Sequence, residues 1–214
     1  MNYFLVTLAL LVSTIARAQY QPLGAITQPV EGFVITTRGD TLVGEVHIVS
    51  LANDSPTSVI VQIPDHEKQK FKGHELRVIA QQIPDFAYQT GSIPREREYV
   101  LFERVTNPRT DKSVLLERLT PADGPLALYF DPSGWKNSPG FTFGNFTISR
   151  EQDLSYILMK NNLEFFLARP TDIEQIHEKA MSDCPAFLER FPKATRRDWK
   201  ELGERVVFYN QSCP

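Results

Sequence analysis

The sequence is poor in the residues that build metal and redox sites. Its 214 residues include two cysteines and four histidines, too few for a zinc ribbon, a zinc finger or a disulfide-rich miniprotein. It also lacks an excess of positive charge, because 23 lysines and arginines face 26 aspartates and glutamates, a net charge of −3. An acidic chain has no general attraction for phosphate backbones. We therefore expect no metal site and no nucleic-acid partner.

The common catalytic signatures are missing as well. The sequence has no H-E-x-x-H zinc motif, no G-x-S-x-G nucleophile turn, no phosphate-binding loop and no G-x-G-x-x-G dinucleotide motif. The motifs therefore assign neither a cofactor nor a catalytic residue, and the sequence favours a protein that is not an enzyme.

The first eighteen residues have the pattern of a signal peptide. An apolar run over 5–15 is followed by Ala16-Arg17-Ala18, which fits the A-x-A pattern of signal peptidase sites. A retained membrane anchor is the weaker alternative, because the run is well short of the ~20 residues that span a bilayer. We expect cleavage between Ala18 and Gln19, with no transmembrane segment left afterwards.

The chain after the signal peptide begins with a predicted β-hairpin. Residues 31–50 contain two β-branched runs joined at Arg38-Gly39-Asp40, where glycine can adopt the positive φ of a tight turn. In the second run Leu42, Val46 and Ile48 fall on one face, which the period of two assigns to the core.

Further short strand patterns continue to residue 168, and the pattern then becomes helical. We expect a lead-in over 19–30, a β-rich domain over 31–168 and a helical segment over 169–214, with the helices capped at Thr171, Asp183 and Thr195. The predicted fold class is α+β, a mostly antiparallel β barrel or sandwich followed by the short C-terminal helical segment. Whether these helices form a separate domain stays open.

The two cysteines, Cys184 and Cys213, lie within the helical segment. In an exported protein such a pair is most simply a disulfide, and two unpaired thiols are the alternative. Redox catalysis is not expected, because the cysteines do not form a C-x-x-C motif.

Aromatic residues between positions 129 and 146 are interleaved with glycine, proline and asparagine, as in loops that present flat rings to a glycan or peptide. The candidate binding residues are Tyr129, Phe130, Trp135 and Phe146. In the competing interpretation Tyr129, with Phe141 and Phe143, is an inward strand position of the core. Trp135, between Gly134 and Lys136, is the ring for which exposure is most plausible.

The string over residues 32–46 fits G-[YF]-[IV]-[IV]-x-x-x-G-D-T-[LI]-x-G-x-[IV], and it resembles the opening motif of uncharacterised exported proteins of Bacteroidetes. The L-Y at Leu128-Tyr129 and the D-C-P at Asp183-Cys184-Pro185 are similar to later segments of that family. The resemblance implies a Gram-negative envelope or secreted location and transfers no catalytic residue. Within the motif, Gly39-Asp40-Thr41 is interpreted as turn chemistry with a structural role.

These observations favour an exported, non-enzymatic binding module whose partner is an unknown envelope protein or glycan. It would be periplasmic or extracellular, or peripheral to the outer membrane, with its oligomeric state undetermined. One alternative is a hydrolase of envelope material that assembles Asp131, Ser133 and His74 from separate loops. Another is a purely structural envelope component.

Overall fold

The computed structural model describes residues 20–90, 93, 97–121, 124–134, 141–143, 146–148 and 154–213. The expected signal peptide, its cleavage site and Trp135 lie outside the described residues. The strands are β1 (Val30–Thr36), β2 (Thr41–Ala52), β3 (Ser55–Gln62), β4 (Gln69–Lys72), β5 (Leu76–Gln82), β6 (Tyr99–Asn107), β7 (Lys112–Arg118), β8 (Leu126–Phe130), β9 (Phe141–Phe143), β10 (Phe146–Ile148), β11 (Tyr156–Lys160) and β12 (Glu164–Ala168). The helical elements are η2 (Gly73–Glu75), η3 (Asp85–Thr90), α2 (Ile173–Ile176), η4 (His177–Met181), α3 (Pro185–Arg190), η5 (Arg196–Glu201) and α4 (Leu202–Ser212).

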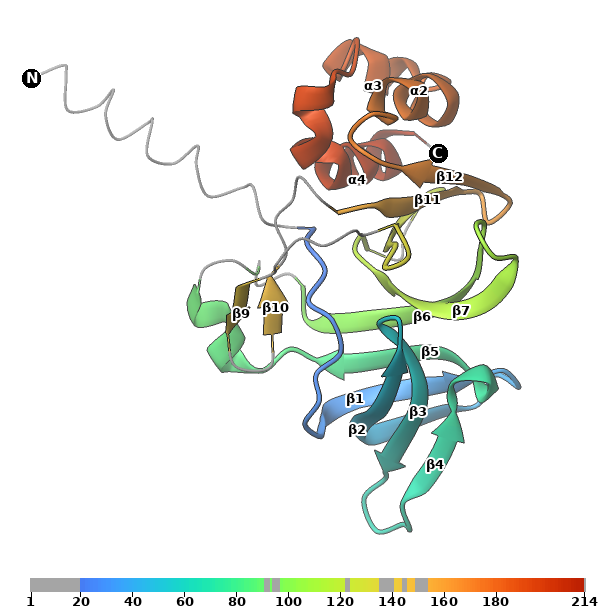
Figure 1. The fold of residues 1–214 in the computed structure, drawn as a ribbon, viewed down its shortest axis with the longest axis vertical. Coiled ribbons are helices and arrows are strands. Elements are labelled where there is room, and N and C mark those ends of the chain that lie inside the picture. Colours follow the sequence, from blue (N-terminus) through green and yellow to red (C-terminus); the bar gives the residue numbers. More distant parts are fainter. Residues whose placement is uncertain are drawn as a thin grey trace, which may run out of the picture.

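Ten of these strands form one antiparallel sheet, and helices α2, α3 and α4 lie together at one end of it (Figure 1). The strand order is β12-β11-β8-β7-β6-β5-β1-β2-β3-β4, and β9 pairs with β10 separately. The predicted α+β fold class is therefore confirmed. Among the described residues, no helix has both the length and the apolar character needed to cross a membrane.

The hairpin predicted from residues 31–50 is formed by β1 and β2, which pair antiparallel. Gly39 has a φ of 98° in the connecting turn, a conformation that glycine adopts without steric cost. Val46 and Ile48 are buried as the alternation predicts. Gly44 lies so close to β3 that a Cβ there would sit 2.2 Å from the carbonyl oxygen of Gln62, which explains a glycine in mid-strand.

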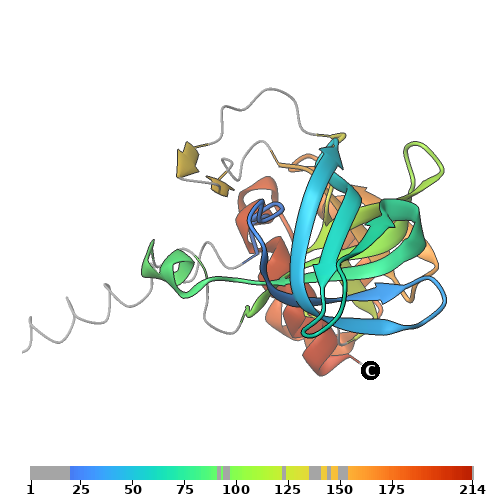
Figure 2. The same ribbon diagram turned by 90° about the horizontal axis from the view of Figure 1, so that it is seen from below.

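The sheet formed by β1 to β6 is strongly curved, as Figure 2 shows, and its side chains form a mostly aliphatic core. Its fully buried members include Val34, Val61 and Ile79. The curvature brings β7 against β3, where the backbone N–H of Leu115 donates to Oγ of Ser55 at 3.2 Å. This contact between strands that are not neighbours in the sheet gives the part of the molecule formed by β1 to β7 its barrel-like form.

The helical layer covers one face of β8, β11 and β12 (Figure 1). Phe187 of α3 and Val206 of α4 are fully buried in this second core, together with Leu128 and Leu158 from the sheet. The predicted disulfide between Cys184 and Cys213 joins the start of α3 to the end of α4. The helices are therefore held to one another covalently as well as by packing.

The lead-in before β1 runs from the helical end of the molecule down across the sheet, in blue in Figure 1. The buried carboxylate of Glu117 accepts hydrogen bonds from the backbone N–H groups of Leu23 at 2.8 Å and Gly24 at 2.9 Å. The Gln81 side chain, fully buried, accepts from Ile26 N and donates to Ile26 O. Two buried polar side chains thus replace the sheet partners that this extended segment lacks.

Candidate functional site

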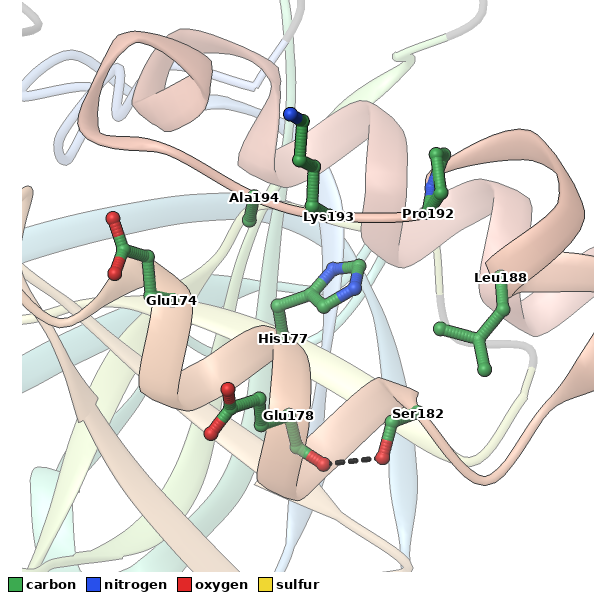
Figure 3. Close-up of a pocket in the computed structure, with 8 residues that line it drawn as sticks. All are labelled: Glu174, His177, Glu178, Ser182, Leu188, Pro192, Lys193 and Ala194. Carbon is green, nitrogen blue, oxygen red and sulfur yellow. Dashed lines mark hydrogen bonds between the residues drawn. The ribbon is translucent and has the colours of Figure 1, made fainter.

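A pocket of about 370 Å³ opens in the helical layer (Figure 3). It lies between the helix formed by α2 and η4 and the chain that follows α3. The lining residues are Glu174, His177, Glu178, Ser182, Leu188, Pro192, Lys193 and Ala194. This volume lies at the lower end of the range for small-molecule sites, which suits a ligand of one or two rings.

His177 is the central residue of the pocket, and its ring points toward residues 192–194 (Figure 3). Its residue surface is 6% exposed, and its ring packs against that of Phe187 with the centroids 5.4 Å apart. Buried Nδ1 has no hydrogen-bond partner in the described part of the chain. Three further side chains there share this property, but none of them lines the pocket: Ser58, Arg109 and Arg205. Nδ1 is thus an unpaired polar atom beside the pocket, but it is closed off from the open space, because it has almost no accessible surface of its own.

The backbone that carries His177 changes from α to π geometry at this residue. Element η4 is a π-helix, which is rare and is often found at functional sites. Just after it, the Ser182 hydroxyl donates a hydrogen bond to the Glu178 carbonyl oxygen, drawn in Figure 3. The wider turn places His177 on the buried side of the helix, together with Ala180 and Met181.

The environment of His177 favours its neutral form. Burial lowers the pKa of the imidazole below its usual 6.5, and the positive charge of Arg205 lowers it further. Glu178 and Asp198 act in the opposite direction but do not outweigh these effects. Arg205 itself is 5% exposed and pairs with Asp198 at 3.3 Å, so its charge stays fixed near the ring. Near neutral pH the ring therefore presents one donor and one acceptor nitrogen.

The rim of the pocket carries charge of both signs beside apolar side chains. Glu174 and Glu178 are exposed on the helix side, and Lys193 is exposed on the opposite side. The Lys193 side chain points away from His177 in Figure 3. Leu188, half-buried, and Pro192 form an apolar wall at the other end. Together these side chains can accept hydrogen bonds through the carboxylates, donate one through the imidazole and pack against the C–H groups of a ligand.

A polar cluster ties the helix that carries His177 to the sheet. Lys160 of β11 donates from Nζ to the carbonyl oxygen of Ala180 at 2.9 Å and to Oδ2 of Asp183 at 2.6 Å. The Tyr209 hydroxyl donates to the other Asp183 oxygen at 2.8 Å. Burial opposes the charge on Lys160, but the hydrogen bonds to Asp183 and Tyr209 outweigh it and raise the pKa of the ammonium. Element η4 is thereby anchored next to the disulfide.

Two of the four aromatic residues that were candidates for binding are buried in the structure. Tyr129 is 1% exposed and Phe130 7% exposed, because β8 is covered by the helices on one face and by side chains of β6, β7 and β11 on the other. The Tyr129 hydroxyl donates to Glu103 at 2.7 Å within the core. Trp135 lies outside the described residues, and of Phe146 only the backbone is described, at the start of β10.

In the described part of the chain, no side-chain hydrogen bond joins Asp131, Ser133 and His74 to one another. Asp131 is fully buried, and its carboxylate accepts hydrogen bonds from Arg109 at 2.9 Å and from the Ser155 hydroxyl at 3.0 Å. The backbone N–H of Ser133 binds its other oxygen. Its hydrogen bonds within the described residues go to Arg109, Ser155 and the Ser133 backbone, and none of them to a histidine.

His177 was not predicted from the sequence, because candidate histidines were sought beside residues that could act with them as acid, base or nucleophile. A usable signal was present, since His177 follows Ile173 by four residues and precedes Met181 by four, on one helical face. Within the described residues, no three histidine, cysteine, aspartate or glutamate side chains are grouped so that they could hold a metal ion.

Comparison of the chain with protein-family models, with curated proteins and with solved structures finds no match. The functional argument therefore depends on the geometry of the chain itself.

Proposed function

We propose that this protein is an exported, non-enzymatic binding protein of the cell envelope, and that the His177 pocket is its binding site for an envelope protein or glycan. The disulfide between Cys184 and Cys213 supports export, because such bonds persist in oxidising compartments. The A-x-A pattern before Gln19 supports removal of a signal peptide. The resemblance of residues 32–46 to exported Bacteroidetes proteins supports a Gram-negative periplasmic or outer-surface location.

One observation carries the assignment of the site: the pocket of about 370 Å³ combines His177, the exposed carboxylates of Glu174 and Glu178 and the apolar side chains of Leu188 and Pro192. A concave surface with a few polar groups beside apolar side chains is the usual form of a ligand site.

The test is a cross-linking pull-down from the native envelope with the wild type and two variants. His177→Phe keeps a ring of similar size against Phe187 and removes both nitrogens, so we expect it to fold. Glu189→Gln changes an exposed residue of α3 that does not line the pocket and serves as the matched control. We expect His177→Phe to lose material that the wild type and Glu189→Gln both capture. Equal capture by all three proteins, with near-UV circular dichroism unchanged, would contradict the assignment.

Export is tested separately by the intact mass of the protein recovered from its native cells. The proposal expects a chain that begins at Gln19 and contains the disulfide. A chain that retains residues 1–18, or that carries two free thiols, would contradict it.

A further inference from the structure

One edge of the main sheet has no partner strand in the described part of the chain. Strands β4 and β12 are the two end strands of the sheet, and they lie at opposite ends of it in Figure 1. On one side β12 pairs with β11, and among the described residues no backbone hydrogen bond from a turn, loop or cap reaches its other side. We propose that this free edge pairs with the β12 edge of a second copy of the chain. The strand contains no residue that lines the His177 pocket, so the proposal is independent of the proposed function.

The two edge strands differ in how they are protected against pairing. An edge strand offers unpaired N–H and C=O groups, and proteins commonly place lysines there to prevent association. Strand β4 carries two exposed lysines, Lys70 and Lys72, in four residues. Strand β12 has neither lysine nor proline, and its pairing with β11 contains no bulge. The β12 edge is therefore the one that can accept another strand.

The side chains of β12 are mostly apolar and remain partly accessible. Phe166 packs against the core beneath the helices, whereas Phe165 and Leu167 pack against the apolar cluster on the other face of the sheet. All three are only half-buried, so neither layer covers the edge completely. Leu163, just before the strand, is 81% exposed and is the most exposed large apolar side chain of the described residues. A partner strand would remove part of this apolar surface from water, which favours association.

Strand β12 is complementary to itself when two copies meet antiparallel, as they do about a two-fold axis perpendicular to the sheet. With Phe166 on the axis, Phe165 lies opposite Leu167 of the second copy, and Glu164 lies opposite Ala168 of the second copy. Directly opposite residues share one face of a sheet. The two pairs of Phe165 with Leu167 therefore lie on the face away from the helices, and Phe166 meets its own copy on the helical face.

The charges at the two ends of β12 fit the same arrangement. Glu164 begins the strand and Arg169 follows its last residue, and both are exposed. In the antiparallel register, Glu164 of each copy lies beside Arg169 of the other, so two attractive pairs form and no like charges are opposed. Exposed pairs add little affinity, but they select the partner and its register. This charge complementarity favours a second copy over an unrelated strand.

The experiment measures the mass of the disulfide-containing protein by sedimentation velocity and the hydrogen exchange of its backbone amides. An interface centred on five residues per copy is small, so the Kd should be micromolar, and concentrations from about 5 to 500 μM bracket it. We expect a reversible equilibrium between monomer and dimer. Exchange of the 164–168 segment should slow as the concentration rises, while exchange of β4 should not change.

Four variants test the edge and its register. Glu164→Arg should raise the dimer Kd about fivefold, because two symmetric pairs change from attraction to repulsion. Adding Arg169→Glu to this variant should restore the wild-type Kd. Phe165→Lys introduces a charge into the apolar pair with Leu167 and should abolish the dimer. Lys72→Glu, on the opposite edge strand, is the matched control and should leave the Kd unchanged.

Three results would overturn the proposal. The first is a protein that stays monomeric over the whole concentration range. The second is a dimer in which the 164–168 segment exchanges no more slowly, or whose Kd is unchanged in a Glu164→Arg variant with wild-type near-UV circular dichroism. The third is protection of this segment only after envelope extract is added, which would show that another protein occupies the edge. None of them alters the result expected from the pull-down with His177→Phe, so the two proposals fail separately.

Discussion

Replacing both cysteines by alanine should remove a large part of the stability of the helical end. The disulfide joins Cys184 and Cys213 across a sequence separation of 29 residues. In the chain-entropy model a loop of that length loses about 12 cal/mol/K in the unfolded state, which corresponds to ~3.6 kcal/mol at 25 °C. This is a substantial share of the ~5–15 kcal/mol that stabilises a typical domain. Alanine is chosen because both cysteines lie in an apolar cluster, where serine hydroxyls would be unsatisfied.

The assay is urea unfolding followed by tryptophan fluorescence, because Trp199 is buried in the helical layer and stacks on Tyr156 with centroids 5.2 Å apart. With a urea dependence of about 1–3 kcal/mol per molar, the midpoint should fall by more than about 1 M. Wild-type protein unfolded and refolded in reductant should match the double variant, whereas reductant should not affect the variant. A loss of less than about 1 kcal/mol would refute the idea that the disulfide holds the helices in place.

Three further perturbations test the polar contacts. Lys160→Met should lower the free energy of unfolding in urea by about 1–2 kcal/mol. The loss should be no larger, because the side chain of Asp183 is 59% exposed and water can solvate it, and a loss above ~4 kcal/mol would contradict this. Glu117→Gln should lower the free energy of unfolding by about 2–4 kcal/mol and speed hydrogen exchange of the backbone amides of residues 23 and 24. Unchanged exchange would show that Glu117 does not hold the lead-in in place. Because the pKa of His177 is lowered on folding, the unfolded state binds more protons, so the unfolding free energy should fall as pH drops from 7 through 6.5. His177→Phe should remove that part of the pH dependence, and an identical slope in the variant would contradict the burial argument.

The β-hairpin could be predicted from sequence because its signals are local. Gly39 marks the turn and the alternation of Val46 and Ile48 marks the buried face, and both depend on neighbours within a few positions. The wrap of β7 onto β3 could not be predicted, since it joins Ser55 and Leu115 across sixty positions of sequence.

The helix caps show the same contrast between local and distant partners. The predicted capping box at Thr195 is present, with the Asp198 carboxylate accepting from the Thr195 backbone N–H at 2.7 Å. The predicted caps at Thr171 and Asp183 are wrong: Asp172 and Cys184 occupy these cap positions, neither with a side-chain hydrogen bond. Asp183 binds Lys160 instead, a residue of another element whose proximity no local pattern reveals.

The binding prediction at Tyr129 and Phe130 failed for a related reason. Nearby glycine and proline indicated a loop, but β8 lies between β7 and β11 in the middle of the sheet, with both faces covered. His177 was missed because the pocket that it lines forms only when residues 192–194 fold across from it, although its spacing from Ile173 already placed it on the buried face of a helix.

The most direct test of the central claim is a crystal structure of the protein purified from its native envelope with bound material retained. The account predicts density for a ligand in the pocket, with an oxygen or nitrogen within hydrogen-bond distance of the imidazole of His177. A pocket that holds water alone would contradict it.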